Sequence, residues 1–107
     1  MQEVQRKSIN WEKTGKNLKA LRNHNDNLRR FVCRKIKGER QECDLNCRQC
    51  RWDIDPSISQ RELAQVFNVS EGMIANWEGN RSVPSLEDLY FYKDICGITL
   101  EEVVVFE

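Results

Sequence analysis

Four of the five cysteines lie close enough together in the sequence to hold one metal ion: Cys33, Cys43, Cys47 and Cys50. The last three follow C-x3-C-x2-C spacing, and loops this short let neighbouring sulfurs reach the same ion. Thiolates are soft ligands that suit tetrahedral zinc. Residues 39–52 are polar and offer little apolar material to bury, so a metal would replace a core that this stretch cannot build. The pattern therefore predicts a structural zinc site with four cysteine ligands.

Other roles for these cysteines stay open. His24 can replace one sulfur as a ligand, although a histidine at a helix end more often faces solvent. Two of the thiols can form a redox switch, because the positive charges of Arg48 and Arg51 would lower the pKa of a neighbouring thiol. A flexible loop with free thiols is a third alternative. The same spacing occurs in iron–sulfur enzymes that use radical chemistry, but those need a large barrel for which 107 residues leave no room.

The charges of the chain are separated along its length. The 17 Lys and Arg residues balance the 17 Asp and Glu residues, so the net charge is zero. Residues 1–52 carry 14 basic and 6 acidic side chains, whereas residues 53–107 carry 3 and 11. Attraction to a polyanion such as nucleic acid must therefore come mostly from the N-terminal half.

Length and hydropathy limit the kind of protein this can be. A chain of 107 residues suits one compact core rather than two ordinary domains. No apolar run approaches the length of a membrane span, and the first residues lack the hydrophobic segment of a signal peptide. We therefore expect a cytoplasmic location, where disulfides are disfavoured. No enzyme is expected either, because no nucleophile and base, and no pair of carboxylates in a cleft, can be identified.

Residues 59–85 predict two short helices joined by a tight turn. Ser59 and Glu62 fit a capping box, in which each side chain satisfies a backbone donor at the start of the first helix. Asn68 tolerates the backbone geometry of a turn, and Ser70 can cap the second helix. Helical spacing places apolar side chains on the inner faces of the two helices: Leu63, Ala64 and Phe67 on the first, and Met73, Ile74 and Trp77 on the second.

This pattern resembles the helix-turn-helix domain of the phage repressor and Cro family, also known as the xenobiotic-response-element family. The matching residues keep a spacing close to that of the family: Ser59, Gln60, Leu63, Ala64, Val69, Ser70, Ile74, Trp77, Glu78, Arg81, Pro84, Ser85 and Leu89. The resemblance implies a five-helix fold that binds double-stranded DNA in transcription control, in a bacterium or its phage, as a homodimer on a two-fold operator. The alternative reading of the motif is an αα-hairpin that merely packs.

The resemblance also divides the chain. Residues 11–23 correspond to the first helix of the family, and residues 24–58 stand where the family has only a handful of residues. The insertion begins with residues 27–37, in which apolar side chains follow helical spacing with basic ones around them, and this predicts an extra amphipathic helix. We thus expect residues 1–9 to be a flexible tail and residues 10–107 a single all-α domain: the five family helices, the inserted basic helix and a cysteine-rich, metal-stapled loop.

The resemblance assigns roles to individual residues. Residues 71–78 would enter the major groove, with four residues at its exposed start able to read base edges: Ser70, Glu71, Met73 and Asn76. Gln60, Asn80 and Arg81 would bind phosphate groups on either side. Arg22 falls where family members often place an arginine paired with the glutamate that here is Glu78, although a solvated arginine is equally compatible with the sequence. Because the motif itself is acidic, we expect further phosphate contacts from the insertion: Arg29, Arg30, Arg34, Lys35, Lys37, Arg48 or Arg51.

The remaining residues complete the predicted core and leave other functions open. Residues 85–96 predict a helix with Leu86, Leu89, Tyr90 and Ile95 on its buried side and Cys96 as a small core residue. Thr99 can cap a last helix, and the apolar end at residues 103–106 is either core or a dimer surface. Two alternative functions are a protein-interaction module of the antitoxin or antirepressor type, and a repressor whose DNA affinity responds to metal or oxidation.

Overall fold

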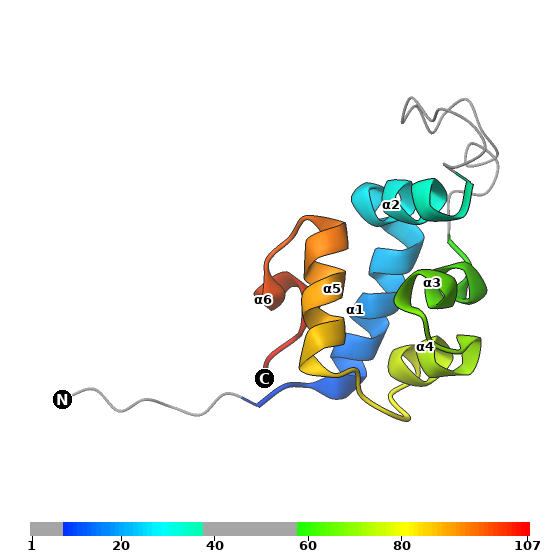
Figure 1. Cartoon of the computed structure of the whole chain (residues 1–107). Coiled ribbons are helices and arrows are strands. Elements are labelled where there is room, and N and C mark those ends of the chain that lie inside the picture. Colours follow the sequence, from blue (N-terminus) through cyan, green and yellow to red (C-terminus); the bar gives the residue numbers. More distant parts are fainter. Residues whose placement is uncertain (1–7, 38–57) are drawn as a thin grey trace.

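The computed structural model describes residues 8–37 and 58–107, which are drawn as coloured ribbon in Figure 1. This part of the chain forms six helices: α1 Trp11–His24, α2 Asp26–Lys37, α3 Gln60–Phe67, α4 Glu71–Glu78, α5 Leu86–Cys96 and α6 Leu100–Val103. Its only β pairing is an isolated antiparallel bridge between Ile9 and Phe106. The predicted all-α fold is confirmed. Every one of these helices is too short or too polar to span a lipid bilayer.

The helices begin and end at residues whose side chains or backbones suit a helix terminus. Asn10 and Ser85 accept hydrogen bonds from the backbone N–H groups of Lys13 and Asp88, which would otherwise lack partners at the first turn. α5 ends at Gly97, whose φ of 67° lies in the left-handed region that glycine adopts without strain. These local signals explain why most helix boundaries could be predicted to within a few residues.

α1 and α2 are joined by a single residue. The Asn25 side chain accepts a hydrogen bond from the backbone N–H of Leu28 at 2.8 Å, while its own backbone N–H donates to Leu21. Asn25 thus ends one helix and caps the next. The inserted helix therefore begins one residue earlier than residues 27–37 predict, and no loop separates it from α1.

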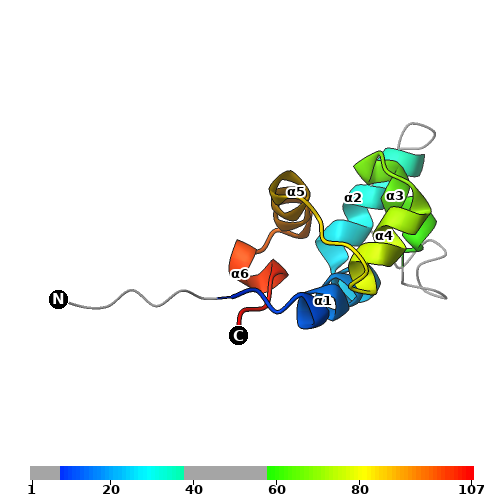
Figure 2. The same ribbon diagram turned by 90° about the horizontal axis from the view of Figure 1, so that it is seen from below.

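α1 packs against α2, α4 and α6, and it lies in the middle of the view in Figure 1. α5 lies in front of α1 in this view, and α2 crosses the end of the bundle and contacts both α5 and α3. α3 and α4 lie together on one side, with α3 between α2 and α4. Seen from below, α5 and α1 lie on opposite sides and α6 fills the space beside them (Figure 2).

The inserted helix is part of the core and not an added arm. Leu28 and Val32 on α2 are fully buried, as are Leu18 on α1 and Leu63 on α3. Burying a leucine or valine side chain stabilises a fold by about 1.5–3 kcal/mol, so these two side chains of α2 contribute to the stability of the core. Removing the insertion would open the core.

The two ends of the described chain pair with each other, and the buried valines near the C-terminal end match the core alternative for residues 103–106. Ser8 and Ile9, placed in the tail, instead pair with the C-terminal segment, where Glu107 N–H donates to the Ser8 carbonyl. Val103 and Val104 are buried in the core, so they cannot form a dimer surface. The C-terminal segment is fixed by Thr14, whose buried hydroxyl accepts from Val105 N–H at 2.9 Å.

The prediction for the buried side of α5 was wrong at two positions. Leu86 and Tyr90 are 63% and 46% exposed, whereas Leu89, Tyr92 and Ile95 point into the core. The helix is apolar around most of its circumference, so its sequence does not decide which side is buried.

Candidate nucleic-acid interface

α3 and α4 form a helix–turn–helix whose turn is closed by local hydrogen bonds. At the start of α3, Glu62 N–H donates to the Ser59 hydroxyl at 3.0 Å, and Ser59 N–H donates to the Glu62 carboxylate at 3.1 Å. Asn68 ends α3 in the left-handed region, with φ of 57°. Ser70 then caps α4 by accepting from Met73 N–H at 3.1 Å. Each step of the turn predicted from the sequence is therefore present.

The inner face of α4 is held against α3 and α1. Ile74 is fully buried and Trp77 is 4% exposed, with its ring edge-to-face against Phe67 at a centroid distance of 5.7 Å. α1 approaches so closely at Gly15 that a Cβ atom there would lie 2.8 Å from the backbone oxygens of Trp77 and Glu78. The position of α4 is therefore fixed on two sides.

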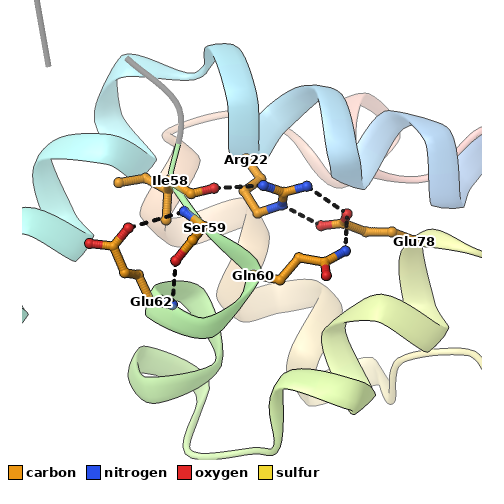
Figure 3. A network of polar contacts seen from close by, with 6 residues as sticks. All are labelled: Arg22, Ile58, Ser59, Gln60, Glu62 and Glu78. Atoms are coloured by element: carbon orange, nitrogen blue, oxygen red, sulfur yellow. Dashed lines mark hydrogen bonds and ion pairs between the residues drawn. The ribbon is translucent and has the colours of Figure 1, made fainter. Parts of the chain in front are cut away.

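A buried polar network ties the end of α4 to α1 and to the start of α3 (Figure 3). The Arg22 guanidinium donates to both oxygens of the Glu78 carboxylate, at 2.8 and 3.0 Å. Its third donor reaches the carbonyl oxygen of Ile58 at 2.6 Å. The Gln60 side-chain amide donates to the same carboxylate at 3.0 Å. The predicted ion pair of Arg22 and Glu78 is present, and it extends to two residues that the sequence did not place in it.

The network is shielded from water. The Arg22 and Glu78 side chains are 10% and 3% exposed, so their charges interact with little screening, and each is matched by hydrogen bonds. Tyr92 lies close by in the core, where its own burial, and after it the charge of Glu78, raise its pKa well above the ordinary value. The phenol of Tyr92 therefore stays protonated.

The outer face of α4 presents the residues expected to read bases. Glu71 and Met73 are exposed, and Asn76 is half-buried on the next turn. Met73 was also expected inward with Ile74 and Trp77, and that expectation was wrong because the side chain is 39% exposed. The Ser70 oxygen already accepts the capping hydrogen bond, which leaves its hydroxyl hydrogen to donate.

Residues expected to bind phosphate lie near the C-terminal end of α4. Gln60 at the start of α3 is half-buried, and its amide nitrogen keeps a second hydrogen beyond the one donated to Glu78. Asn80 follows α4 with φ of 60°, and Arg81 beside it is exposed. Among the described residues no ion pair engages Arg81. The C-terminal end of α4 therefore has one preoriented amide and one accessible guanidinium beside it.

The basic residues of α2 lie elsewhere. Arg29 is bound to Asp26 at 2.6 Å, and its side chain is only 16% exposed. Arg30 and Arg34 line a groove shared with α5, and Lys35 lies over the Phe31 ring at 5.6 Å. Because α3 separates α2 from α4, the geometry does not bring these four cations to the outer face of α4. Arg48, Arg51 and the side chain of Lys37 are outside the described residues.

The predicted metal site falls largely outside the described residues. Cys33 is half-buried on α2, whereas Cys43, Cys47 and Cys50 belong to the part that is not described. Within residues 8–37 and 58–107, no three His, Cys, Asp or Glu side chains come close enough to hold a metal ion. Cys96 is a core residue as predicted, and burial raises the pKa of its thiol to about 12, which keeps it protonated.

Two contributors to the site were missed at the sequence level. Gly15 makes the close contact between α1 and α4, and its only signal is a glycine in the middle of a helix, where it would otherwise be unfavourable. The carbonyl oxygen of Ile58 completes the network around Arg22. A backbone acceptor carries no sequence signal, so only the structure reveals it.

Comparison with known proteins agrees with this geometry. Residues 57–103 match the family model described as Helix-turn-helix. Searches of curated proteins and of solved structures give no match. The matched segment begins just before α3 and ends with α6, so it includes the capped turn and α4 and leaves out α1 and α2. The chain therefore carries a helix-turn-helix domain over residues 57–103, to which the Arg22 network joins α1.

Proposed function

We propose that this protein binds double-stranded DNA sequence-specifically and regulates transcription, with α4 in the major groove. The observation that carries the proposal is the family match over residues 57–103, together with an outer face of α4 that is not needed for the core. An α-helix fits into the major groove of B-DNA, where each base pair presents a distinct pattern of hydrogen-bond donors and acceptors.

Four residues at the exposed part of α4 would read the bases. Asn76 can pair bidentately with adenine, and Met73 can contact a thymine methyl group. Glu71 can accept from a cytosine amine, and the Ser70 hydroxyl can donate to a base acceptor. Gly72, between Glu71 and Met73, has no side chain and leaves its backbone exposed. Asn76 is therefore the residue on which specificity depends most.

Gln60, Asn80 and Arg81 would bind phosphate groups near the C-terminal end of α4. The hydrogen bond from Gln60 to Glu78 holds its amide in place before DNA arrives, so less side-chain freedom is lost on binding. Arg81 can form two parallel hydrogen bonds to one phosphate. The Arg22 network would thus support DNA binding indirectly, by orienting Gln60 and by fixing the end of α4.

Base and phosphate contacts can be separated by their different effects on binding. We expect Asn76→Ala to weaken binding to a site selected from a random duplex library by about 1–3 kcal/mol without changing the salt dependence. Arg81→Ala should weaken binding to all sequences alike and flatten the slope of log K against log salt by about one unit. Fluorescence anisotropy over a salt series measures both, with Lys19→Ala on the outer face of α1 as the control. Equal losses on selected and random DNA for Asn76→Ala would refute its role as a base reader.

We further propose that the protein binds DNA as a homodimer through a patch formed by Val83, Leu86 and Tyr90. These side chains are 50%, 63% and 46% exposed, and Leu86 and Tyr90 lie one turn apart on the same side of α5. The patch follows the loop after α4, so a two-fold axis through it would place two α4 helices next to each other along the duplex.

If the patch mediates dimerisation, the average molecular mass in solution should rise with protein concentration. Sedimentation equilibrium of the unmodified chain should show a monomer–dimer equilibrium, and Leu86→Glu should shift it at least tenfold toward monomer, because a charge at the interface is poorly solvated there. Lys19→Ala also lowers the net charge by one, away from the patch, and should leave the equilibrium unaltered. A chain that stays monomeric at high concentration, or a dimer that Leu86→Glu leaves intact, would contradict the proposal.

We also propose that Cys33, Cys43, Cys47 and Cys50 bind one structural zinc ion. Their sequence spacing and the polar composition of residues 39–52 support this. Elemental analysis of the purified protein should give about one zinc per chain, and all five thiols should resist a thiol reagent until the protein is denatured, four because they bind zinc and Cys96 because it is buried. A metal-free protein with four reactive thiols would refute the zinc site and leave the redox switch as the alternative.

A further inference from the structure

A groove in two parts lies along α2 from Asn27 to Ile36, where α2 faces α5 and α3. Its first part, of about 400 Å³, lies between the N-terminal half of α2 and Phe91, Asp94 and Ile95 of α5. Its second part, of about 600 Å³, lies between the C-terminal half of α2 and Gln65 and Val66 of α3. Phe31 and Phe91 line both parts, so the two parts adjoin at this aromatic pair.

The floor of this groove is apolar and aromatic. Phe31 and Phe91 meet edge-to-face with ring centroids 5.9 Å apart, and Phe91 packs in the same manner on Phe67 at 4.7 Å. Phe31, Phe91, Ile36 and Val66 are half-buried, so each keeps a surface open to the groove. Phe31, Phe67 and Phe91 thus pack against the core on one side, and Phe31 and Phe91 leave apolar surface exposed in the groove on the other.

The rim of the groove is basic. Arg30, Arg34 and Lys35 are exposed along α2. Among the described residues that line the groove, the single acidic one is Asp94, whose carboxylate already contacts Lys93 at 3.3 Å. A partner with negative charge flanking an apolar ridge would complement both the rim and the floor.

We propose that this groove binds an acidic amphipathic helix of another protein. Apolar side chains at helical spacing would enter on both sides of the Phe31–Phe91 pair, and flanking carboxylates would pair with Arg30 and Arg34. From Asn27 to Ile36 the groove spans about 14 Å, which accommodates two to three turns of a bound helix. The site is separate from the DNA-binding face, because α3 lies between α2 and α4.

The chemistry of the groove favours a protein partner over DNA. A phosphate backbone would satisfy the rim but would leave four half-buried apolar side chains in contact with charge and water. A second copy of this chain is less suited to the groove. Its acidic α6 has only four residues, with Val103 fully buried, and the exposed Leu86 and Tyr90 of α5 belong to the patch proposed above for the homodimer.

The test uses a fluorescein-labelled peptide of about 14 residues with leucine at helical positions i, i+4, i+7 and i+11 and glutamate on the flanking positions. Titration with the full chain, followed by fluorescence anisotropy, should give a dissociation constant on the order of 10 µM. A control peptide of the same composition, with its leucines spread around the helix, should bind at least tenfold more weakly. Amide chemical-shift changes should map to α2 and to Val66 and Phe91.

Variants with reversed charges show which surface of the protein binds the peptide. Arg30→Glu with Arg34→Glu should weaken peptide binding at least tenfold, whereas Lys16→Glu with Lys19→Glu on α1 makes the same change of charge and should weaken it less than twofold. No peptide binding, equal binding of both peptides, or equal loss in both double variants would overturn the proposal. So would a loss of DNA affinity or of dimerisation confined to the Arg30 and Arg34 variant, since DNA or a second copy would then be the partner of these residues.

Discussion

Replacing Arg22 with alanine is expected to lower the free energy of unfolding by about 3–5 kcal/mol, the usual effect of removing one partner of a buried ion pair. The change leaves the Glu78 carboxylate buried at 3% exposure with only the Gln60 amide beside it, and it removes the donor to the Ile58 carbonyl. Urea denaturation followed by circular dichroism measures the loss.

A double variant separates the ion pair from the packing of its side chains. Arg22→Met with Glu78→Leu removes both charges, so it should be less destabilising than Arg22→Ala alone, because no uncompensated charge remains. Lys16→Ala breaks an exposed pair with Glu12 on the same helix and should change stability by no more than about 1 kcal/mol. If Arg22→Ala were as mild as Lys16→Ala, the network would have no structural role.

Replacing Gly15 with alanine is expected to destabilise the fold by about 1–3 kcal/mol, although alanine is the better helix former. The added methyl group would lie 2.8 Å from two backbone oxygens at the end of α4, and neither can rotate away. α1 and α4 must therefore move apart, which also strains the bond from Arg22 to Glu78. Thermal unfolding and the amide chemical shifts of α4 report the two effects.

Gly72→Ala is the matched control for this prediction. Gly72 lies within α4, and a Cβ atom there would meet nothing closer than the Ser70 hydroxyl at 3.9 Å. The same substitution should therefore stabilise the protein by roughly 0.4–1 kcal/mol, because it restricts the unfolded chain without a clash. Opposite signs for the two variants would confirm the close contact between α1 and α4. A stabilising Gly15→Ala would contradict it.

The helix–turn–helix could be predicted in detail because its signals are local. The capping box of Ser59 and Glu62, the left-handed Asn68 and the cap at Ser70 each act within four residues, and the structure contains all of them. Such interactions depend on sequence neighbours and not on the rest of the fold. The pairing of Arg22 with Glu78 joins distant residues, and it could be placed only through the resemblance to a family.

What covers the apolar side of α2, and which side of α5 is buried, depend on tertiary packing, which could not be predicted from the sequence. The pattern of α2 shows that Leu28 and Val32 share an apolar face, but it does not show that α5 and α3 cover that face. On α5, apolar residues on several sides made the inward positions ambiguous, and Leu86 and Tyr90 were assigned to the wrong side. The basic residues of α2 were assigned to phosphates on charge alone, whereas their positions follow from the packing of α2 on α5.

Sequence-specific recognition of DNA by α4 is tested most directly by selecting bound duplexes from a random library. The full chain should enrich one short sequence motif, and the Asn76→Ala variant should enrich a motif that has lost its preference at one or two base pairs. Enrichment of no motif by the folded chain, with equal affinity for all duplexes, would contradict sequence-specific recognition by α4.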